Sequence, residues 1–176
     1  TSVSLTAQPS AGFLFSSWTG PDSARLSSTT VPNPTIVMDG DYSVTANFVA
    51  QRTLTISATV GGAVTPASPT VVADGTTVTL VATALPNYTF TGWSGANAAD
   101  LSSSTLASVT ITMNGDKTVA ATFEPIMRTL TVSAGTGGSA TPAGATQVIQ
   151  GSSVSLTALP SAGFLFSSWT GPDSAR

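Results

Sequence analysis

An all-β fold, repeated in tandem, is the fold class that this sequence predicts, and three observations predict it. Apolar and polar residues alternate with a period of two through most of the chain, which is typical of half-buried strands. The 16 Gly and 11 Pro residues divide these stretches into short segments. The first 25 residues return almost unchanged as the last 25, as expected of a tandem array.

The repeat unit is about 76 residues long. Trp18, Trp93 and Trp169 mark the same place in three copies, at intervals of 75 (93 − 18) and 76 (169 − 93) residues. A segment of this length is large enough to bury a small core of its own, so we predict separate β-domains in series. The chain then divides into the last two-thirds of one repeat, a complete repeat and the first two-thirds of another, at residues 1–51, 52–127 and 128–176.

The two partial copies leave two interpretations open. In the first, the natural protein is a longer array, and the near identity of residues 1–25 and 152–176 indicates an alternating two-repeat unit of 151 residues (152 − 1). In the second, the partial copies complete each other between chains.

Strands are predicted in order along the complete repeat. Apolar residues fall at every second position in residues 52–60, 77–84, 108–113 and 118–123, so each segment is predicted to bury one face. No segment of ten or more residues has a 3.6-residue pattern, although residues 96–107 leave room for one short helical turn. We expect a small mixed sheet of about five to six strands in each unit.

Tight turns are predicted where Gly follows Asp or Asn between two strands. Asp39-Gly40 and Asn114-Gly115 occupy equivalent places between alternating apolar residues. This pattern predicts two-residue hairpins with type I′ turns. A calcium site needs six to eight oxygen ligands, so turn geometry explains Asp39 better than a metal does.

The composition excludes several classes of function. The chain has no Cys and no His, so we expect no disulfide, no zinc site and no Cys-based or His-based catalysis. A net charge of −3, with only five Lys and Arg spread along the chain, argues against nucleic acid. No apolar run reaches the length of a membrane helix, so no membrane insertion of this segment is expected. No acidic residues converge in the sequence, and we expect neither catalytic activity nor a cofactor.

Aromatic residues at matching positions of the three copies form the strongest candidate site. We predict that they close the core of each unit, because an aromatic side chain buries about 150–250 Å² and the other core residues are mostly small. The alternative is a surface platform in which the Trp-containing loops bind glycan. The aromatic signature consists of Phe15, Trp18, Phe48, Phe90, Trp93, Phe123, Phe166 and Trp169.

A charged pair follows the Trp in the outer copies alone. Asp22 and Arg25 recur as Asp173 and Arg176, and the middle copy has neither. Their spacing allows an ion pair within the loop. An exposed pair of this kind contributes about 0–1 kcal/mol, so we expect it to mark a contact of alternate units rather than to stabilise the fold.

The residues around the Trp resemble a known family. Residues 85–95 carry Tyr-x-Phe-x-Gly-Trp-x-Gly, and residues 109–123 carry Met-x-x-Asp-x-x-Val-x-Ala-x-Phe at the end of a strand. Together they resemble the divergent InlB B-repeat family of large secreted and surface proteins of bacteria. Ser17 and Ser168 replace the Gly before Trp. The resemblance implies small β-rich modules, β-grasp-like in related repeats, that serve as stalk or adhesive spacer without catalysis.

The expected role is therefore that of a non-enzymatic structural repeat protein, outside the cell or on the bacterial surface, as a stalk or a filament-forming segment. Strand faces rich in Thr and Ser lack the charges that discourage edge-to-edge pairing, which favours self-association with like chains or neighbouring repeats. The alternative is that these hydroxyl groups form a solvated, protease-resistant and glycosylated surface. Short connections between units favour a semi-rigid rod. Two alternatives remain: an adhesin that binds a host or glycan surface through the Trp loops, and an accessory repeat array of a large secreted enzyme.

Overall fold

The computed structural model describes residues 1–171, and these residues form an all-β protein, as predicted. Within them the helical elements are two 3-10 turns, η1 (Ser23–Arg25) and η2 (Ala98–Asp100). The strands are β1 (Ser2–Ser4), β2 (Phe13–Thr19), β3 (Thr35–Val37), β4 (Thr45–Ala58), β5 (Gly62–Thr65), β6 (Thr70–Ala73), β7 (Thr77–Ala84), β8 (Tyr88–Ser94), β9 (Ser108–Thr112), β10 (Lys117–Pro125), β11 (Met127–Val132), β12 (Gly138–Thr141), β13 (Gly144–Ile149) and β14 (Thr157–Pro160).

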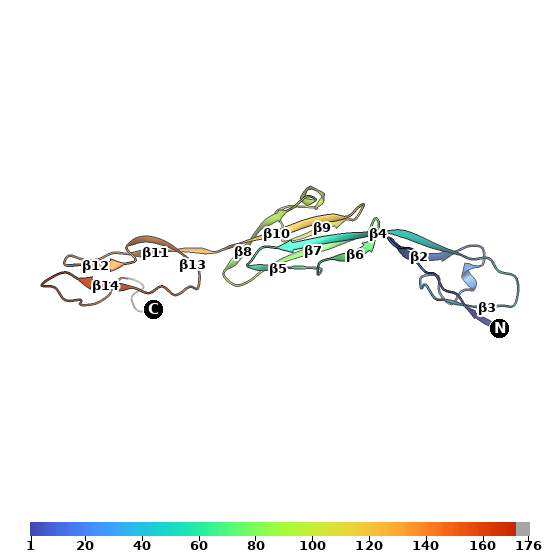
Figure 1. Cartoon of the computed structure of the whole chain (residues 1–176), viewed down its shortest axis with the longest axis horizontal. Helices are drawn as coiled ribbons and strands as arrows, with labels where there is room; N and C mark the ends of the chain where they lie inside the picture. The colour runs from blue at the N-terminus through green and yellow to red at the C-terminus, as the bar shows by residue number, and fades with distance from the viewer. Residues whose placement is uncertain (172–176) are drawn as a thin grey trace.

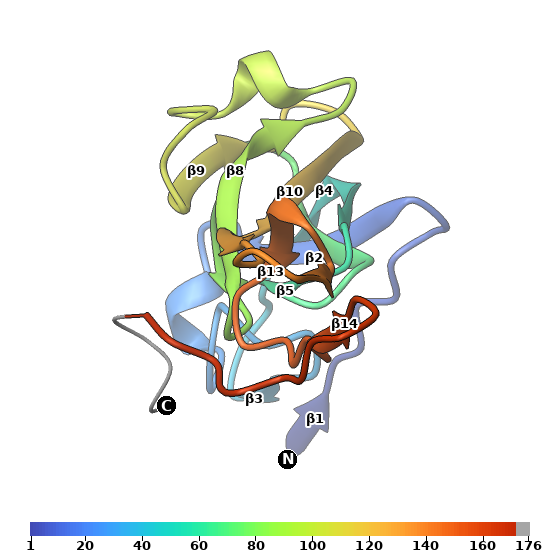
Figure 2. The same cartoon turned by 90° about the vertical axis from the view of Figure 1, so that its left-hand side faces the viewer.

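The three copies follow one another along the long axis of the molecule (Figure 1). The N-terminal copy lies at one end, the C-terminal copy at the other, and the complete repeat between them. Figure 2 looks along this axis from the C-terminal end, with the copies one behind another. The arrangement is that of units joined in series.

The middle unit, residues 52–127, contains two sheets rather than the single sheet expected. One sheet has the order β6-β4-β10-β8, and the other has the order β5-β7-β9. The pairing of β4 with β10 is parallel, and the other pairs in the unit are antiparallel. Alternation of the apolar residues lets each sheet turn one face to the other.

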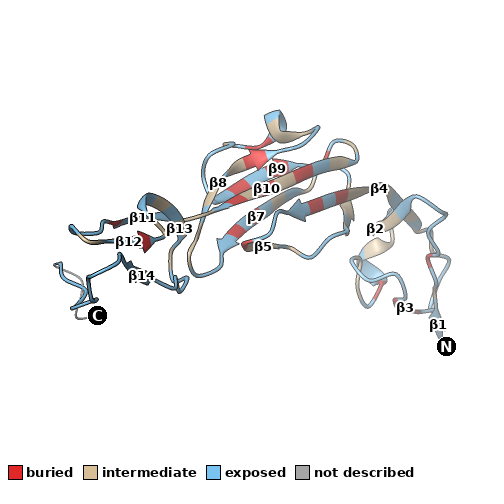
Figure 3. Cartoon of the chain, turned by 60° about the vertical axis from the view of Figure 1, so that its left-hand side comes forward, coloured by how far each residue is buried: buried red, intermediate tan, exposed pale blue. Residues whose placement is uncertain are grey.

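The core of the middle unit lies between these two sheets. Leu54 and Val119 from one sheet meet Leu80 and Ile111 from the other, and each is at most 1% exposed. Figure 3 shows the buried residues gathered on the strands of this unit. Full burial of one such side chain contributes about 1.5–3 kcal/mol, so this core is the main source of stability in the middle unit.

The hairpins predicted at Asp39-Gly40 and Asn114-Gly115 are not formed. β9 pairs with β7, whereas β10 pairs with β4 and β8, so Asn114-Gly115 connects the two sheets. In the first copy, likewise, β3 pairs with β1 and β4 pairs with β2. Gly40 and Gly115 do not have the positive φ that a type I′ turn requires. The physical reason is that β9 and β10 pack against the same core from opposite layers.

Each outer copy holds part of the same architecture. The N-terminal half-unit, residues 1–51, contains β1, β2, β3 and the first part of β4 around a small core with Trp18 and Ile36. The C-terminal half-unit, residues 128–171, contains β12, β13, β14 and nearly all of β11. Positions 75 or 76 residues apart take equivalent places in the copies, so β12 and β13 correspond to β5 and β6, while β2 corresponds to β8.

Candidate functional site

Trp93 is a core residue of the middle unit. The ring of Phe90 lies 5.7 Å from those of Trp93 and Phe123, edge to face with both. The Trp93 Nε1–H donates to the carbonyl oxygen of Leu106 at 2.9 Å, so its polar atom has a partner although the residue is only 5% exposed. An indole in this position has no free face for a sugar.

The N-terminal half-unit repeats this aromatic trio with one difference. Phe15 lies 6.0 Å from Trp18 and 6.2 Å from Phe48, and Trp18 Nε1–H donates to the Val31 carbonyl oxygen at 3.1 Å. Trp18 is 9% exposed, but Phe48 is 40% exposed. The three rings contact one another as in the middle unit, but Phe48 is exposed to solvent whereas its equivalent Phe123 is buried.

Phe166 and Trp169 do not occupy the core position predicted for them. Their rings lie 5.6 Å apart, yet the residues are 49% and 37% exposed. Residues 128–171 contain no counterpart of β10 that would supply the third ring, and residues 161–171 form no strand. The pair therefore lies on the surface of the C-terminal half-unit.

A polar clamp fixes the loop that follows Trp18 and the loop that follows Trp93. Asp22 accepts a hydrogen bond from the Ser43 backbone N–H at 2.8 Å, and Asn97 accepts one from the Thr118 N–H at 2.9 Å. These pairs are equivalent, so Asp22 has the structural role that Asn97 fills in the middle unit. The predicted Asp22–Arg25 ion pair is not formed because the Asp22 carboxylate is directed to this backbone. Asp173 and Arg176 lie outside the described residues.

The charges beside this clamp differ between copies but bring the same segments together. In the N-terminal half-unit Arg25 lies 5.2 Å from the ring centroid of Tyr42 and 3.7 Å from Asp39. The Tyr42 hydroxyl donates to Asp39, which lowers the pKa of the carboxyl group and raises the pKa of the phenol. In the middle unit the equivalent pair is Asp100 and Lys117.

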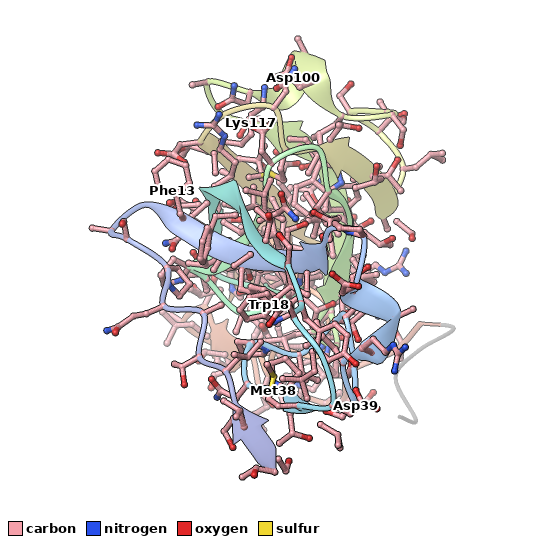
Figure 4. The ribbon with its side chains drawn as sticks, turned by 90° about the vertical axis from the view of Figure 1, so that its right-hand side faces the viewer. Phe13, Trp18, Met38, Asp39, Asp100 and Lys117 are labelled. Atoms are coloured by element: carbon pink, nitrogen blue, oxygen red, sulfur yellow. The ribbon has the colours of Figure 1, made fainter. Side chains whose placement is uncertain are left out.

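Lys117 and Asp100 form an ion pair of 2.7 Å at the edge of the middle unit (Figure 4). The Lys117 ammonium is the main cause of a lowered pKa of the Asp100 carboxyl, and the Asn97 amide, 3.0 Å away, lowers it further. Lys117 takes the position that Tyr42 has in the N-terminal half-unit, and Asp100 takes the position of Arg25. The paired segments thus keep an attractive contact in both copies.

The first junction between copies is a continuous strand. β4 pairs with β2 through Thr45–Ala50 and with β6 and β10 through Gln51–Ala58. At the crossing point, the Gln51 N–H donates to the Gly12 carbonyl oxygen at 2.8 Å. Arg52 Nε–H then donates to Asp74 at 2.5 Å. No flexible linker separates the two cores.

The second junction keeps these contacts around a short break. The Ile126 N–H donates to the Asn87 carbonyl oxygen at 2.8 Å, and Arg128 donates to Gln150 at 2.9 Å. One extra residue and Pro125 occupy this place, and the strand is interrupted at Ile126 alone, between β10 and β11. The Arg52–Asp74 and Arg128–Gln150 pairs form a junction clamp that sequence reasoning missed. The sequence does carry a signal for it, because a basic residue is followed 22 positions later by a polar one in both the middle and the C-terminal copy.

An open groove marks the C-terminal half-unit. It has a volume of about 500 Å³ and lies between the Gly-rich segment 133–140 and the aromatic segment 164–170. The equivalent space of the middle unit is filled, because the Phe123 ring lies where a Cβ on Gly62 would be, at 2.3 Å. Gly138 is the counterpart of Gly62, and the atoms nearest its Cβ position belong to the backbone of Leu159 and Pro160, whereas the Phe164 ring occupies the Cβ position of the preceding Gly137.

Serial β-units with the same strand pairs, aromatic contacts and junction bonds define a tandem-repeat β-protein. The sequence profile of the divergent InlB B-repeat domain matches residues 1–52, 52–127 and 128–176, and the chain belongs to that family. The family is associated with bacterial surface proteins. Comparisons with curated proteins and with solved structures gave no significant match. Among residues 1–171 no helix has the length and apolar character needed to cross a membrane.

Proposed function

We propose that this chain is a non-enzymatic structural segment that holds neighbouring domains at a fixed distance and orientation, as part of an extracellular stalk or filament on a bacterial surface. The observation that carries the proposal is β4. One strand of 14 residues belongs to two units at once, so rotation of one unit against the other requires breaking the hydrogen bonds of that strand. The family supports the surface location.

The acidic residues support a structural rather than a catalytic role. Each of five carboxylates has a local partner that positions a loop or a junction. These pairs are Asp22 with the Ser43 N–H, Asp39 with Tyr42, Asp74 with Arg52, Asp100 with Lys117, and Asp116 with the Thr53 N–H. Carboxylates engaged in this way do not converge on a common point as the paired acids of a hydrolase do.

The adhesin alternative receives less support from the Trp residues. Trp18 and Trp93 are buried and donate to backbone carbonyl groups, so they serve the fold. Trp169 alone is exposed among them, and its equivalents in the other copies are covered by packing. A sugar platform repeated along the array is therefore not the function that we propose.

Spin labels test the rigidity of the junction. Cysteines introduced at the exposed residues Ser16 and Thr79 place one label in the N-terminal half-unit and one in the middle unit. We expect a narrow distribution of label distances by pulsed electron resonance. Insertion of a short Gly-Ser segment between Ala50 and Gln51 is expected to broaden it, because such linkers are flexible.

A label pair within the middle unit, at Thr79 and Thr89, is the matched control and should remain narrow in both chains. A broad Ser16–Thr79 distribution in the uninterrupted chain, equal to that of the Gly-Ser variant, would refute the rod. Retention of the narrow distribution after the insertion would show that β4 is not the element that fixes the two units.

A further inference from the structure

Strand β6 is an open edge of the sheet β6-β4-β10-β8 in the complete middle unit (Figure 1). The other edge of this sheet, β8, is covered, because the Trp93 N–H donates to the Ser104 carbonyl oxygen at 2.7 Å. The edge β9 of the second sheet is covered by the same loop, where the Ser102 N–H donates to the Thr110 carbonyl oxygen at 2.9 Å. Among the described residues, β6 pairs with β4 alone.

The antiparallel ladder determines which backbone groups of β6 face outward. The Asp74 N–H, one residue beyond the strand, donates to the Ala50 carbonyl oxygen at 2.8 Å, so every second residue of β6 turns its polar groups toward β4. Val71 and Ala73 lie between those residues and turn theirs away from β4. The Ala73 carbonyl oxygen accepts from the Thr76 N–H at 3.1 Å. The Val71 N–H and carbonyl oxygen and the Ala73 N–H have no partner among the described residues.

Pro69 completes this outward row. Thr70 turns its N–H toward β4, and the N–H and C=O of a trans peptide point in opposite directions, so the Pro69 carbonyl oxygen points outward. Pro69 has no N–H of its own. Along the edge, Pro69 therefore offers an acceptor, Val71 a donor and an acceptor, and Ala73 a donor. This order is complementary to itself when a second copy of the strand runs in the opposite direction.

The edge lacks the features that commonly prevent edge-to-edge pairing. β6 has the sequence Thr-Val-Val-Ala, with no charge and no internal Pro, and its register with β4 has no bulge. Val72 packs against the core, so Val71 lies on the outer face of the sheet, where it is 46% exposed. The nearest acidic group, Asp74, is engaged by Arg52 at 2.5 Å. An approaching strand therefore meets an uncharged, apolar edge.

The same edge recurs in β13, which follows a complete unit. Gln147 and Ile149 are the counterparts of Val71 and Ala73, and the Ile149 carbonyl oxygen accepts from the Ser152 N–H at 3.0 Å, as Ala73 does from Thr76. The hydrogen bonds to the middle unit are made by Gln150, one residue beyond β13. A complete neighbouring unit thus leaves the edge open.

We propose that β6 pairs with β6 of a second copy of this chain, antiparallel and about a two-fold axis at Val71, so that two rods associate side by side. The two Val71 residues exchange both of their hydrogen bonds, and each Ala73 N–H donates to the Pro69 carbonyl oxygen of the other copy. Asp74 then lies opposite Ser68, so no like charges are opposed. The contact is isologous, and it goes beyond the rod role because it joins separate chains.

Site-specific crosslinking tests this register. The chain of 176 residues has no Cys, so Val71→Cys introduces a single thiol. Facing residues of a hydrogen-bonded antiparallel pair have Cα atoms about 5.5 Å apart, within the range of about 4.4–6.8 Å that a disulfide spans, so oxidised glutathione should yield a linked dimer. Ala73→Cys is the matched control on the same face. Its two copies would be offset by four residues, about 14 Å along the strand, so no dimer is expected. No dimer at 71, or equal yields at 71 and 73, would overturn the proposal.

Sedimentation of the unmodified chain gives a second readout that needs no thiol. We expect the average mass to rise with concentration above that of one chain. Val71→Lys combined with Gln147→Lys places a charge on both open edges and should abolish the rise. Thr79→Lys with Thr89→Lys adds the same charge at exposed positions elsewhere and should leave it unchanged. A chain that is monomeric at every concentration, or equal behaviour of the two Lys variants, would overturn the proposal. The label distances across the first junction test the rod separately.

Discussion

Truncation of Trp93 to Ala tests the assignment of the aromatic trio to the core. The side chain is 5% exposed, packs edge to face on Phe90 at 5.7 Å and donates a hydrogen bond to the Leu106 carbonyl. Removal of a large buried aromatic costs about 3–5 kcal/mol. A unit of this length has a total stability of roughly 4–11 kcal/mol at 0.05–0.15 kcal/mol per residue. We expect the variant to lose a large part of the stability of the middle unit.

The matched control is Trp169→Ala. Trp169 is 37% exposed and has one aromatic neighbour, Phe166, so its truncation should cost less than about 1 kcal/mol. Urea unfolding followed by circular dichroism gives the midpoint, and hydrogen exchange at the amides of Val119 and Ala121 localises the loss to the middle unit. Equal effects of the two truncations would refute the reasoning. So would a Trp93→Ala chain that keeps its midpoint and loses binding to a glycan.

Two further predictions concern the loop after the Trp. The pKa of Asp100 is held below its ordinary value of 3.8, mainly by Lys117, so the contribution of this pair to stability is present above 3.8 and is lost as the pH falls through the lower folded pKa. Lys117→Met should reduce this acid sensitivity, measured as the fall in the urea midpoint between neutral and acidic pH; an unchanged fall would contradict it. Gly95 has φ 105° and a Cβ there would lie 3.0 Å from the Thr118 carbonyl oxygen, whereas Gly75, with φ 80°, has open space. Gly95→Ala should therefore lower the free energy of unfolding by more than Gly75→Ala, for which left-handed strain costs about 1–2 kcal/mol. Equal losses would show that the contact with Thr118 gives way.

The elements with strict apolar alternation could be predicted from the sequence. Residues 77–84 coincide with β7, and residues 108–113 and 118–123 overlap β9 and β10. In each case the buried face is long enough for period two to dominate over local turn preferences. The recurrence of Trp18, Trp93 and Trp169 likewise revealed the order of the copies, because it depends on identity rather than on conformation.

The pairing of those strands could not be predicted from local pattern. Asn114-Gly115 has the composition of a hairpin turn, but its two flanking strands belong to different sheets. Which strand is a neighbour depends on the whole set of faces that the core must accommodate, and short strands such as β5 and β6 complete that set beside Pro66 and Pro69. The alternation of apolar and polar residues indicates that one face of a strand is buried, but it does not indicate which strand packs on that face.

The junction clamp and the exposed rings also escaped prediction for physical reasons. Arg52 and Asp74 are 22 residues apart and meet only because β6 lies alongside β4. Phe48 and Phe166 have the sequence surroundings of core residues, yet they are 40% and 49% exposed, because the described residues of their copies do not hold all the strands that bury their equivalents in the middle unit. A repeat pattern describes what a residue packs against in a complete unit, and the outer copies are incomplete.

The parallel pairing of β4 with β10 determines how the middle unit responds to tension. The chain enters this unit along β4 and leaves it along β10, and the two strands run side by side through five partner pairs, from Leu54 with Lys117 to Ala58 with Ala121. A pull on the neighbouring units draws these strands in opposite directions along their length. The hydrogen bonds between them are then sheared together instead of being opened one after another, so the load is shared across the whole ladder.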